Sequence, residues 1–169
     1  MIRLQGGSAV SQLEEIEAIK QLKYRYFRCL DTKDWAGIRE TLAEDATSAY
    51  DGGKYSFEGR DAIVQFLSDA LGSSRVVSRH HGHHPEIELV SETAARGTWY
   101  LEDYVLFCET KLVVRGAAFY HDEYEKIDGR WRIKSTGYER TYEIVEKAGP
   151  MENLRTMFDG SSLSGGGAT

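Results

Sequence analysis

Hydrophobic residues in the first part of the chain recur every three or four positions, which is the period of an α-helix that packs on one side. This pattern predicts a first helix over residues 11–30, and Ser11 with Glu14 has the spacing of a capping box at its start. The side chains expected on its buried face are Leu13, Ile16, Ile19, Leu22, Tyr26 and Leu30. The same period predicts shorter helices over residues 35–43 and 60–71, with a turn at residues 51–54 between two short extended segments.

From Val76 onward the period changes to two, which is the alternation of a β-strand with one buried face. Alternating apolar residues predict strands around residues 87–89, 99–107, 113–119 and 131–133, and Asp128-Gly129 is typical of a hairpin turn between the last two. Helices first and strands last predict an α+β fold. We expect a cone in which N-terminal helices pack on a strongly curved, mainly antiparallel sheet and enclose a pocket for a small apolar ligand.

Composition narrows the class of protein. The chain has 169 residues, 41% of them hydrophobic, and a net charge of −6, which disfavours nucleic acid or an anionic membrane surface as a partner. Two cysteines make no disulfide framework, so we expect a cytoplasmic protein. We predict a flexible lead-in over residues 1–10, one catalytic domain over 11–145, and an extension over 146–169 that ends in a flexible Gly/Ser-rich tail.

Asp103 stands out in the strand predicted at residues 99–107. Alternation places it on one face with Trp99, Leu101 and Val105, and those large apolar side chains mark that face as the buried one. A buried carboxylate is costly without a partner. Asp103 therefore belongs to a structural ion pair, is turned outward by a bulge, or tunes an ionisable group inside the pocket.

Tyr26, Asp31 and Arg140 each have two interpretations. Tyr26 lies on the buried face of the first helix, where its hydroxyl needs a hydrogen-bond partner. Asp31 follows near the end of that helix, where it caps the next helix or turns into the same cavity. Arg140 shares its strand parity with Tyr138 and Tyr142, either at the surface or as the partner of an anionic substrate group or a pocket carboxylate.

Four of the five histidines lie within residues 80–84. A metal site needs ligands that converge on one point, but adjacent residues of a strand point to opposite faces, so at most two of these imidazoles converge. No HExxH or CxxC motif completes a ligand set. We therefore predict no metal and one imidazole that acts as an acid/base group, oriented by Asp31 or Asp103.

Five stretches together resemble the SnoaL-like branch of the NTF2-like superfamily, and within it the bacterial bile-acid 7α-dehydratase family. They are IEAIKQLKYRYFRCLD, HHGHHPEIE, ARGTWYLEDYV, GAAFYHDEYEKIDGRW and TGYER, and they agree in order and spacing. The resemblance implies a cone-shaped α+β fold, a homotrimer, and neither metal nor organic cofactor. It also implies a catalytic set, to which we add expected substrate contacts. The catalytic residues are Tyr26, Asp31, His80, Asp103 and Arg140, and the substrate-binding residues are His83, Trp99 and Tyr138.

The choice among the histidines rests on the regularity of one strand. Strict alternation back from Ile87 selects His81 and His83 for the buried face, whereas the resemblance selects His80. A bulge near Gly82 or an irregularity before Pro85 would reconcile the two. We expect His80 to be the working imidazole, with His83 as the second choice.

The implied function is a cofactor-independent dehydratase that removes an allylic 7α-hydroxyl from a 3-oxo-4-ene steroid or bile-acid derivative, as the free acid or as a coenzyme A thioester. Tyr26 would donate to the ketone oxygen and His80 would carry the proton. Two alternatives stay open. The same groups would serve an isomerase, cyclase or dehydratase of a polyketide-like aromatic or other polycyclic substrate, or the protein would bind a hydrophobic ligand without catalysis.

Overall fold

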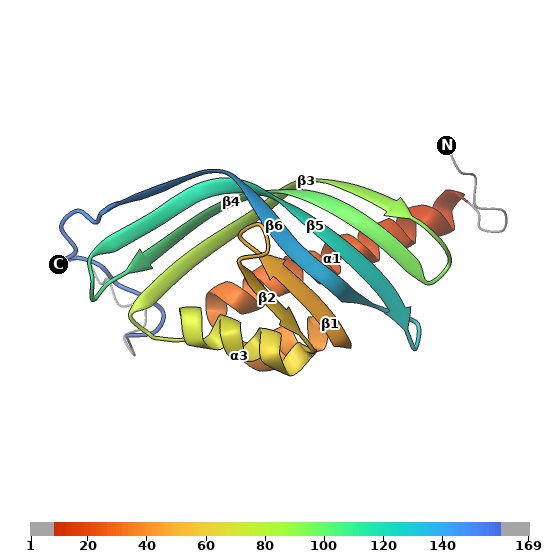
Figure 1. The fold of residues 1–169 in the computed structure, drawn as a ribbon, viewed down its shortest axis with the longest axis horizontal. Coiled ribbons are helices and arrows are strands. Elements are labelled where there is room, and N and C mark those ends of the chain that lie inside the picture. The colour runs from red at the N-terminus through yellow and green to blue at the C-terminus, as the bar shows by residue number, and fades with distance from the viewer. Residues whose placement is uncertain (1–8, 160–169) are drawn as a thin grey trace, which may run out of the picture.

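The computed structural model describes residues 9–159, and in that range helices cover one face of a six-stranded sheet. The helices are α1 (Ala9–Thr32), α2 (Trp35–Thr41) and α3 (Arg60–Leu71). Figure 1 shows the long strands arching over α1 and α3, which lie on the concave side of the arch. The expected α+β class and the curved sheet are confirmed, and the sheet is open rather than closed into a barrel.

The sheet has the order β2-β1-β6-β5-β4-β3. Its strands are β1 (Leu42–Tyr50), β2 (Tyr55–Glu58), β3 (Val76–Leu89), β4 (Ala94–Phe107), β5 (Leu112–Ile127) and β6 (Arg130–Lys147). All neighbours are antiparallel except β1 and β6, which run parallel. The predicted antiparallel run after residue 76 is therefore confirmed, and the β1–β2 hairpin adds two strands to the sheet through the parallel pairing of β1 with β6.

Two details of the predicted helices are wrong. The described part of the first helix begins at Ala9, so Ser11 lies within the helix rather than before its first residue. Leu13 is 66% exposed, so it does not belong to the buried face. The second helix ends at Thr41, and Leu42 is buried as the first residue of β1 instead. Residues 1–8 of the predicted lead-in and residues 160–169 of the predicted tail lie outside the described residues. Within residues 9–159, no helix has both the length and the apolar character needed to cross a bilayer.

Irregularities in two strands decide which side chains face the helices. The pairing of β3 with β4 shifts between His83 and Glu86, and His84 has a positive φ of 47°. This shift is the irregularity expected before Pro85, and it lets His80 face the concave side while Ile87 packs against the same core.

A second shift lies between β5 and β6. Arg140 pairs with Ala118 and Tyr142 pairs with Ala117, which leaves Thr141 as the extra residue. Tyr138 packs against the core, whereas Tyr142 is 53% exposed. The predicted common face of Tyr138, Arg140 and Tyr142 is therefore wrong at Tyr142, because one inserted residue reverses the alternation.

Candidate active site

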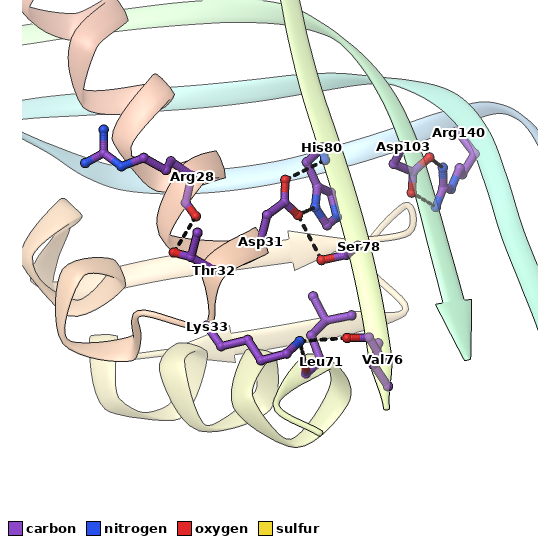
Figure 2. A network of polar contacts seen from close by, with 10 residues as sticks. All are labelled: Arg28, Asp31, Thr32, Lys33, Leu71, Val76, Ser78, His80, Asp103 and Arg140. Carbon is purple, nitrogen blue, oxygen red and sulfur yellow. Dashed lines mark hydrogen bonds and ion pairs between the residues drawn. The ribbon is translucent and has the colours of Figure 1, made fainter. Parts of the chain in front are cut away.

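His80 and Asp31 form the closest pair among the predicted site residues. Asp31 comes from the last turn of α1, and its Oδ1 lies 2.7 Å from Nδ1 of the His80 imidazole on β3. The same carboxylate accepts hydrogen bonds from the His80 backbone N–H at 2.8 Å and from the Ser78 hydroxyl at 2.8 Å. Figure 2 shows Asp31 reaching from the helix to these two residues of β3. Three hydrogen bonds therefore fix the position of the Asp31 carboxylate, and this carboxylate orients the His80 imidazole.

The contacts of Asp31 determine its charge and the tautomer that a neutral His80 imidazole adopts. Burial alone would raise the pKa of Asp31, but the hydrogen bonds from His80 and Ser78 outweigh it and lower the pKa. An ionised Asp31 can only accept, so Nδ1 of a neutral His80 carries the hydrogen and Nε2 carries the free lone pair. Among the described residues, no hydrogen bond engages Nε2 of His80. The pair has the form of a general base with an oriented tautomer.

Asp103 has Arg140 as its partner. Arg140 donates from Nη1 at 2.5 Å and from Nη2 at 2.8 Å to the two carboxylate oxygens, which is the bidentate geometry that favours arginine over lysine. Burial would lower the pKa of Arg140, but the bonds to Asp103 raise it above its usual value. In the register of β3 with β4, Asp103 lies directly opposite His80. The hydrogen-bond partner of the His80 imidazole is nevertheless Asp31. Of the interpretations open for Asp103, the structure shows the ion pair.

The arginine reaches Asp103 across β5, at Gly116. A Cβ atom at Gly116 would lie 2.4 Å from the Tyr142 carbonyl oxygen and 3.0 Å from Nη1 of Arg140. Gly116 pairs directly with Asp103, so a side chain at this position would occupy the space that the guanidinium uses. The strand between the two partners therefore needs a glycine here.

Tyr26 belongs to a cluster of tyrosines rather than to the His80 pair. Its hydroxyl lies 3.1 Å from the hydroxyl of Tyr50, and Tyr50 and Tyr120 each pack against Tyr138. Burial raises the pKa of Tyr26 well above its ordinary value, so the phenol is a neutral donor. Among residues 9–159, Tyr26 makes no hydrogen bond to His80 or Asp103; the Phe27 ring contacts both Tyr26 and His80.

Trp99 is fully buried and donates its indole N–H to the hydroxyl of Tyr124 at 2.8 Å. Tyr124 in turn donates to Asp122 at 2.8 Å, and Thr136 donates to the same carboxylate at 2.7 Å. The predicted substrate contact at Trp99 is thus one end of a buried polar network. Tyr138 is half-buried beside Arg140, whose guanidinium lies 5.2 Å from the ring centre.

A buried lysine completes this network and was not predicted from the sequence. Nζ of Lys23 on α1 lies 2.7 Å from Oδ2 of Asp122, and both side chains are fully buried. The ammonium also lies 3.7 Å from the ring centre of Tyr120. Burial lowers the pKa of Lys23, and Asp122 offsets only part of that effect. The signal was available, since Lys23 follows Leu22 on the buried face of the helix and Asp122 alternates with Tyr120 and Tyr124.

Large side chains take up part of the space between α1 and the sheet. Tyr26, Trp99, Tyr124 and Lys23 are among the largest fully buried ones. A cavity of ≈ 590 Å³ lies elsewhere, between β3, β4, β5 and β6, and its lining is mostly polar and includes Glu88, Arg96 and His121. Of the predicted site residues, all of which the structure describes, none lines this cavity.

His83 lies away from His80. Its imidazole is 5.7 Å from that of His81, and Glu102 on β4 completes a group of three potential ligands on this side of β3. Because His80 contacts α1 and its neighbours alternate, His81 and His83 face the convex side of the sheet. The structure therefore brings Asp31 to His80 and Arg140 to Asp103, and it separates His83 from both pairs.

Comparison of the sequence with models of known protein families identifies one matching family. The model of the SnoaL-like domain matches residues 11–137, which include every predicted catalytic residue except Arg140. That range runs from the first turn of α1 into β6 and spans most of the described fold.

Solved structures with the same fold have low sequence identity. A scytalone dehydratase-like protein from Novosphingobium aromaticivorans DSM 12444 has a TM-score of 0.75 and 23% identity, over 88% of this chain and 100% of that one. The hexachlorocyclohexane dehydrochlorinase LinA-type3 from Novosphingobium barchaimii LL02 has a TM-score of 0.73 and 20% identity, over 82% and 94%. ActVI-ORFA from Streptomyces coelicolor has a TM-score of 0.65 and 19% identity, over 76% and 98%.

Proposed function

This chain belongs to the SnoaL-like domain family, and on that premise we propose that it is a cofactor-independent lyase that eliminates water from a hydroxylated polycyclic ketone. The proposed substrate is a 7α-hydroxylated 3-oxo-4-ene steroid or bile-acid derivative, as the free acid or as a coenzyme A thioester. The observation that carries the proposal is the hydrogen bond of 2.7 Å between Asp31 and Nδ1 of His80, which leaves Nε2 as a base.

In the proposed reaction, Nε2 of His80 removes the proton at the carbon vinylogous to the ketone. The electron pair moves into the ring system as a dienolate, and the adjacent C–O bond breaks as the second double bond forms. The imidazolium returns its proton to the departing hydroxide, so that water leaves and the enzyme is restored. No electrons are gained or lost overall, and Asp31 stabilises the imidazolium between the two proton transfers.

Two further groups have proposed roles in this reaction. The neutral hydroxyl of Tyr26 donates to the ketone oxygen and stabilises the dienolate, and substrate binding has to replace its present hydrogen bond to Tyr50. The Asp103–Arg140 pair positions the substrate next to Tyr138, which is half-buried in the structure. We also propose a homotrimer, for which light scattering should give a mass of three times 19.1 kDa.

The names of two structural neighbours support an elimination. One is described as scytalone dehydratase-like and another as a hexachlorocyclohexane dehydrochlorinase, and a base that removes a proton from the carbon next to the leaving group promotes both loss of water and loss of hydrogen chloride. A pocket protein without catalysis would need no oriented imidazole. The His80–Asp31 pair therefore favours the enzyme over a ligand-binding protein.

The test is incubation with 7α-hydroxy-3-oxo-4-ene bile acids, free and as thioesters, while the long-wavelength absorbance of the dienone product is followed. His80→Ala should lower kcat/KM by at least ~10²-fold, which is the usual contribution of general acid/base catalysis. His84→Asn is the matched control, because His84 belongs to the same cluster and asparagine tolerates its positive φ. Full turnover by His80→Ala would contradict the role of the imidazole, and no absorbance change with any of these compounds would contradict the steroid substrate.

A further inference from the structure

The convex side of the sheet carries a second set of ionisable side chains, which the proposed reaction does not use. His81 and His83 are two residues apart on β3 and therefore share a face, and Glu102 on β4 pairs directly with His81. One ligand atom from each of these three residues lies within 4.8 Å of the other two. We refer to His81, His83 and Glu102 as the convex trio.

The spacing of the convex trio suits a single ion. Zinc bonds of about 2.0–2.2 Å in tetrahedral geometry place neighbouring ligand atoms roughly 3.4 Å apart. The two imidazole planes stand at 78° to one another, so the rings do not stack and their nitrogens can turn toward a common point. His81 and Glu102 are exposed and His83 is half-buried, so side-chain rotations can close the remaining gap without moving the strands.

The trio is also free to bind. Among residues 9–159, no hydrogen bond or ion pair joins Glu102 to another side chain, in contrast to Asp31, Asp103 and Asp122, which all have partners. Two imidazoles and one carboxylate are ligands that favour first-row transition metals and zinc over magnesium or calcium, which prefer oxygen alone. Exposure leaves room for water or another ligand at the open coordination positions.

We propose that His81, His83 and Glu102 bind one divalent transition-metal ion on the convex face of the sheet, apart from the His80–Asp31 pair. The expectation of no metal rested on the rule that at most two imidazoles of one strand converge. That rule holds here, but the neighbouring strand supplies the third ligand through the register of β3 with β4. The proposal does not depend on the proposed lyase activity, because no residue of the trio takes part in that reaction.

The experiment uses protein without an affinity tag, since a polyhistidine tag would itself bind metal. After treatment with a chelator and its removal, zinc chloride is titrated into the protein at neutral pH in a calorimeter. One zinc ion should bind per chain. His81→Ala, His83→Ala and Glu102→Gln should each weaken binding by about tenfold or more, which is at least the effect of losing a group that supports a ligand.

Two control variants test whether the ion binds at the convex trio and not at a neighbouring group. His84→Asn removes the neighbouring imidazole, which stands 5.9 Å from that of His83, and should leave zinc affinity unchanged. Asp31→Asn alters the concave pair and should also leave it unchanged. Addition of Co²⁺ gives a second readout, because visible absorption bands report ligand number and should be lost in Glu102→Gln.

Three results would overturn the proposal. The first is the absence of stoichiometric zinc binding to the wild-type protein. The second is binding that Glu102→Gln leaves intact, which would reduce the trio to two surface imidazoles. The third is binding lost in His84→Asn or Asp31→Asn and kept in His81→Ala, which would place the ion elsewhere. All substitutions at the trio lie at exposed or half-buried positions, and thermal melts of each variant verify that it is folded.

Discussion

Three buried or half-buried carboxylates point toward the concave side of the sheet, and each has a different cationic or hydrogen-bonding partner. Asp31 holds a histidine, Asp103 holds an arginine, and Asp122 lies against a lysine. Of these partners, only the histidine side chain ordinarily changes charge near neutral pH. The choice of partner is what singles out Asp31, since the three carboxylates are alike in type and in their placement beside apolar neighbours.

The lowered pKa of Asp31 predicts an acid dependence of stability. Burial opposes the shift, but the hydrogen bonds from His80 and Ser78 outweigh it. Because the folded-state pKa is below the unfolded value of about 3.9, this contribution is present above that pH and is lost as the pH falls through the folded pKa. In urea denaturation between pH 3 and pH 7, the wild type should lose stability more steeply below about pH 4 than Asp31→Asn does. If the free energies of unfolding of the wild type and Asp31→Asn changed in parallel with pH, the lowered pKa of Asp31 would be contradicted.

The buried Lys23–Asp122 pair predicts an asymmetry between its two partners. After Asp122→Asn, the Lys23 ammonium loses its carboxylate and keeps only aromatic ring faces, so the loss should be about 3–5 kcal/mol, as for other broken buried pairs. After Lys23→Met, Asp122 still accepts from Tyr124 and Thr136, so the loss should be smaller. Urea denaturation with a linear extrapolation measures both. An equal or larger loss in Lys23→Met would show that the hydroxyl donors do not support the carboxylate.

At the scale of elements, one residue of β3 sets how closely the strand approaches α1. Gly82 lies two residues after His80, and a Cβ atom there would lie 2.3 Å from Cε2 of Phe27. The Phe27 ring lies almost parallel to the His80 ring, with 6° between their planes. The absence of a side chain at Gly82 therefore leaves room for the Phe27 ring, whose centre lies 6.5 Å from that of the His80 ring.

Gly82→Ala should displace Phe27 and disturb the imidazole. We expect a loss of about 1–3 kcal/mol in the free energy of unfolding, as for other overpacked sites, and a decrease of about tenfold or more in kcat/KM. Gly149→Ala is the matched control, because no atom lies within 4 Å of its added Cβ. Normal activity in Gly82→Ala would mean that Phe27 does not position His80.

At the scale of the whole molecule, the segment that follows β6 covers one end of the sheet. Ala148 and Met151 pack against Leu106, Cys108 and Val113, and Thr156 is buried.

Further along the same segment, the centre of the Phe158 ring lies 4.6 Å from Nζ of Lys33. The Lys33 ammonium also donates hydrogen bonds to the backbone carbonyls of Leu71 and Val76. The segment thus connects a small apolar cluster of the sheet with the end of α1.

Removal of this segment should lower stability without abolishing the fold. A chain that ends at Lys147 exposes Leu106 and Val113, and two large apolar side chains are worth about 3–6 kcal/mol when fully buried, so we expect a loss of about 2–5 kcal/mol. Thermal melts measure the change. A chain that ends at Asp159 keeps the segment and is the reference for the loss. Equal melting temperatures for the two shortened chains would show that the segment does not stabilise the apolar cluster.

The sequence alone determined the local features. Periods of three to four and then two correctly predicted most elements and the α+β class, because those periods follow from helix and strand geometry. The same reasoning found that Asp103 needs a partner, because the alternation of apolar residues displays its neighbours within a single strand. Regular alternation back from Ile87 selected His81 and His83 for the buried face, whereas the resemblance selected His80, which contacts α1 in the structure.

Only the tertiary structure decided which distant groups meet. Asp31 and His80 are 49 residues apart, and the packing of α1 on β3 brings them together. The register shifts after His83 and at Thr141 each insert one residue and reverse every face beyond them, and regular alternation does not reveal such an insertion. The buried Lys23–Asp122 pair and the convex trio likewise depend on the pairing of neighbouring elements. Contacts across elements are set by packing and register, and these are properties of the folded chain as a whole.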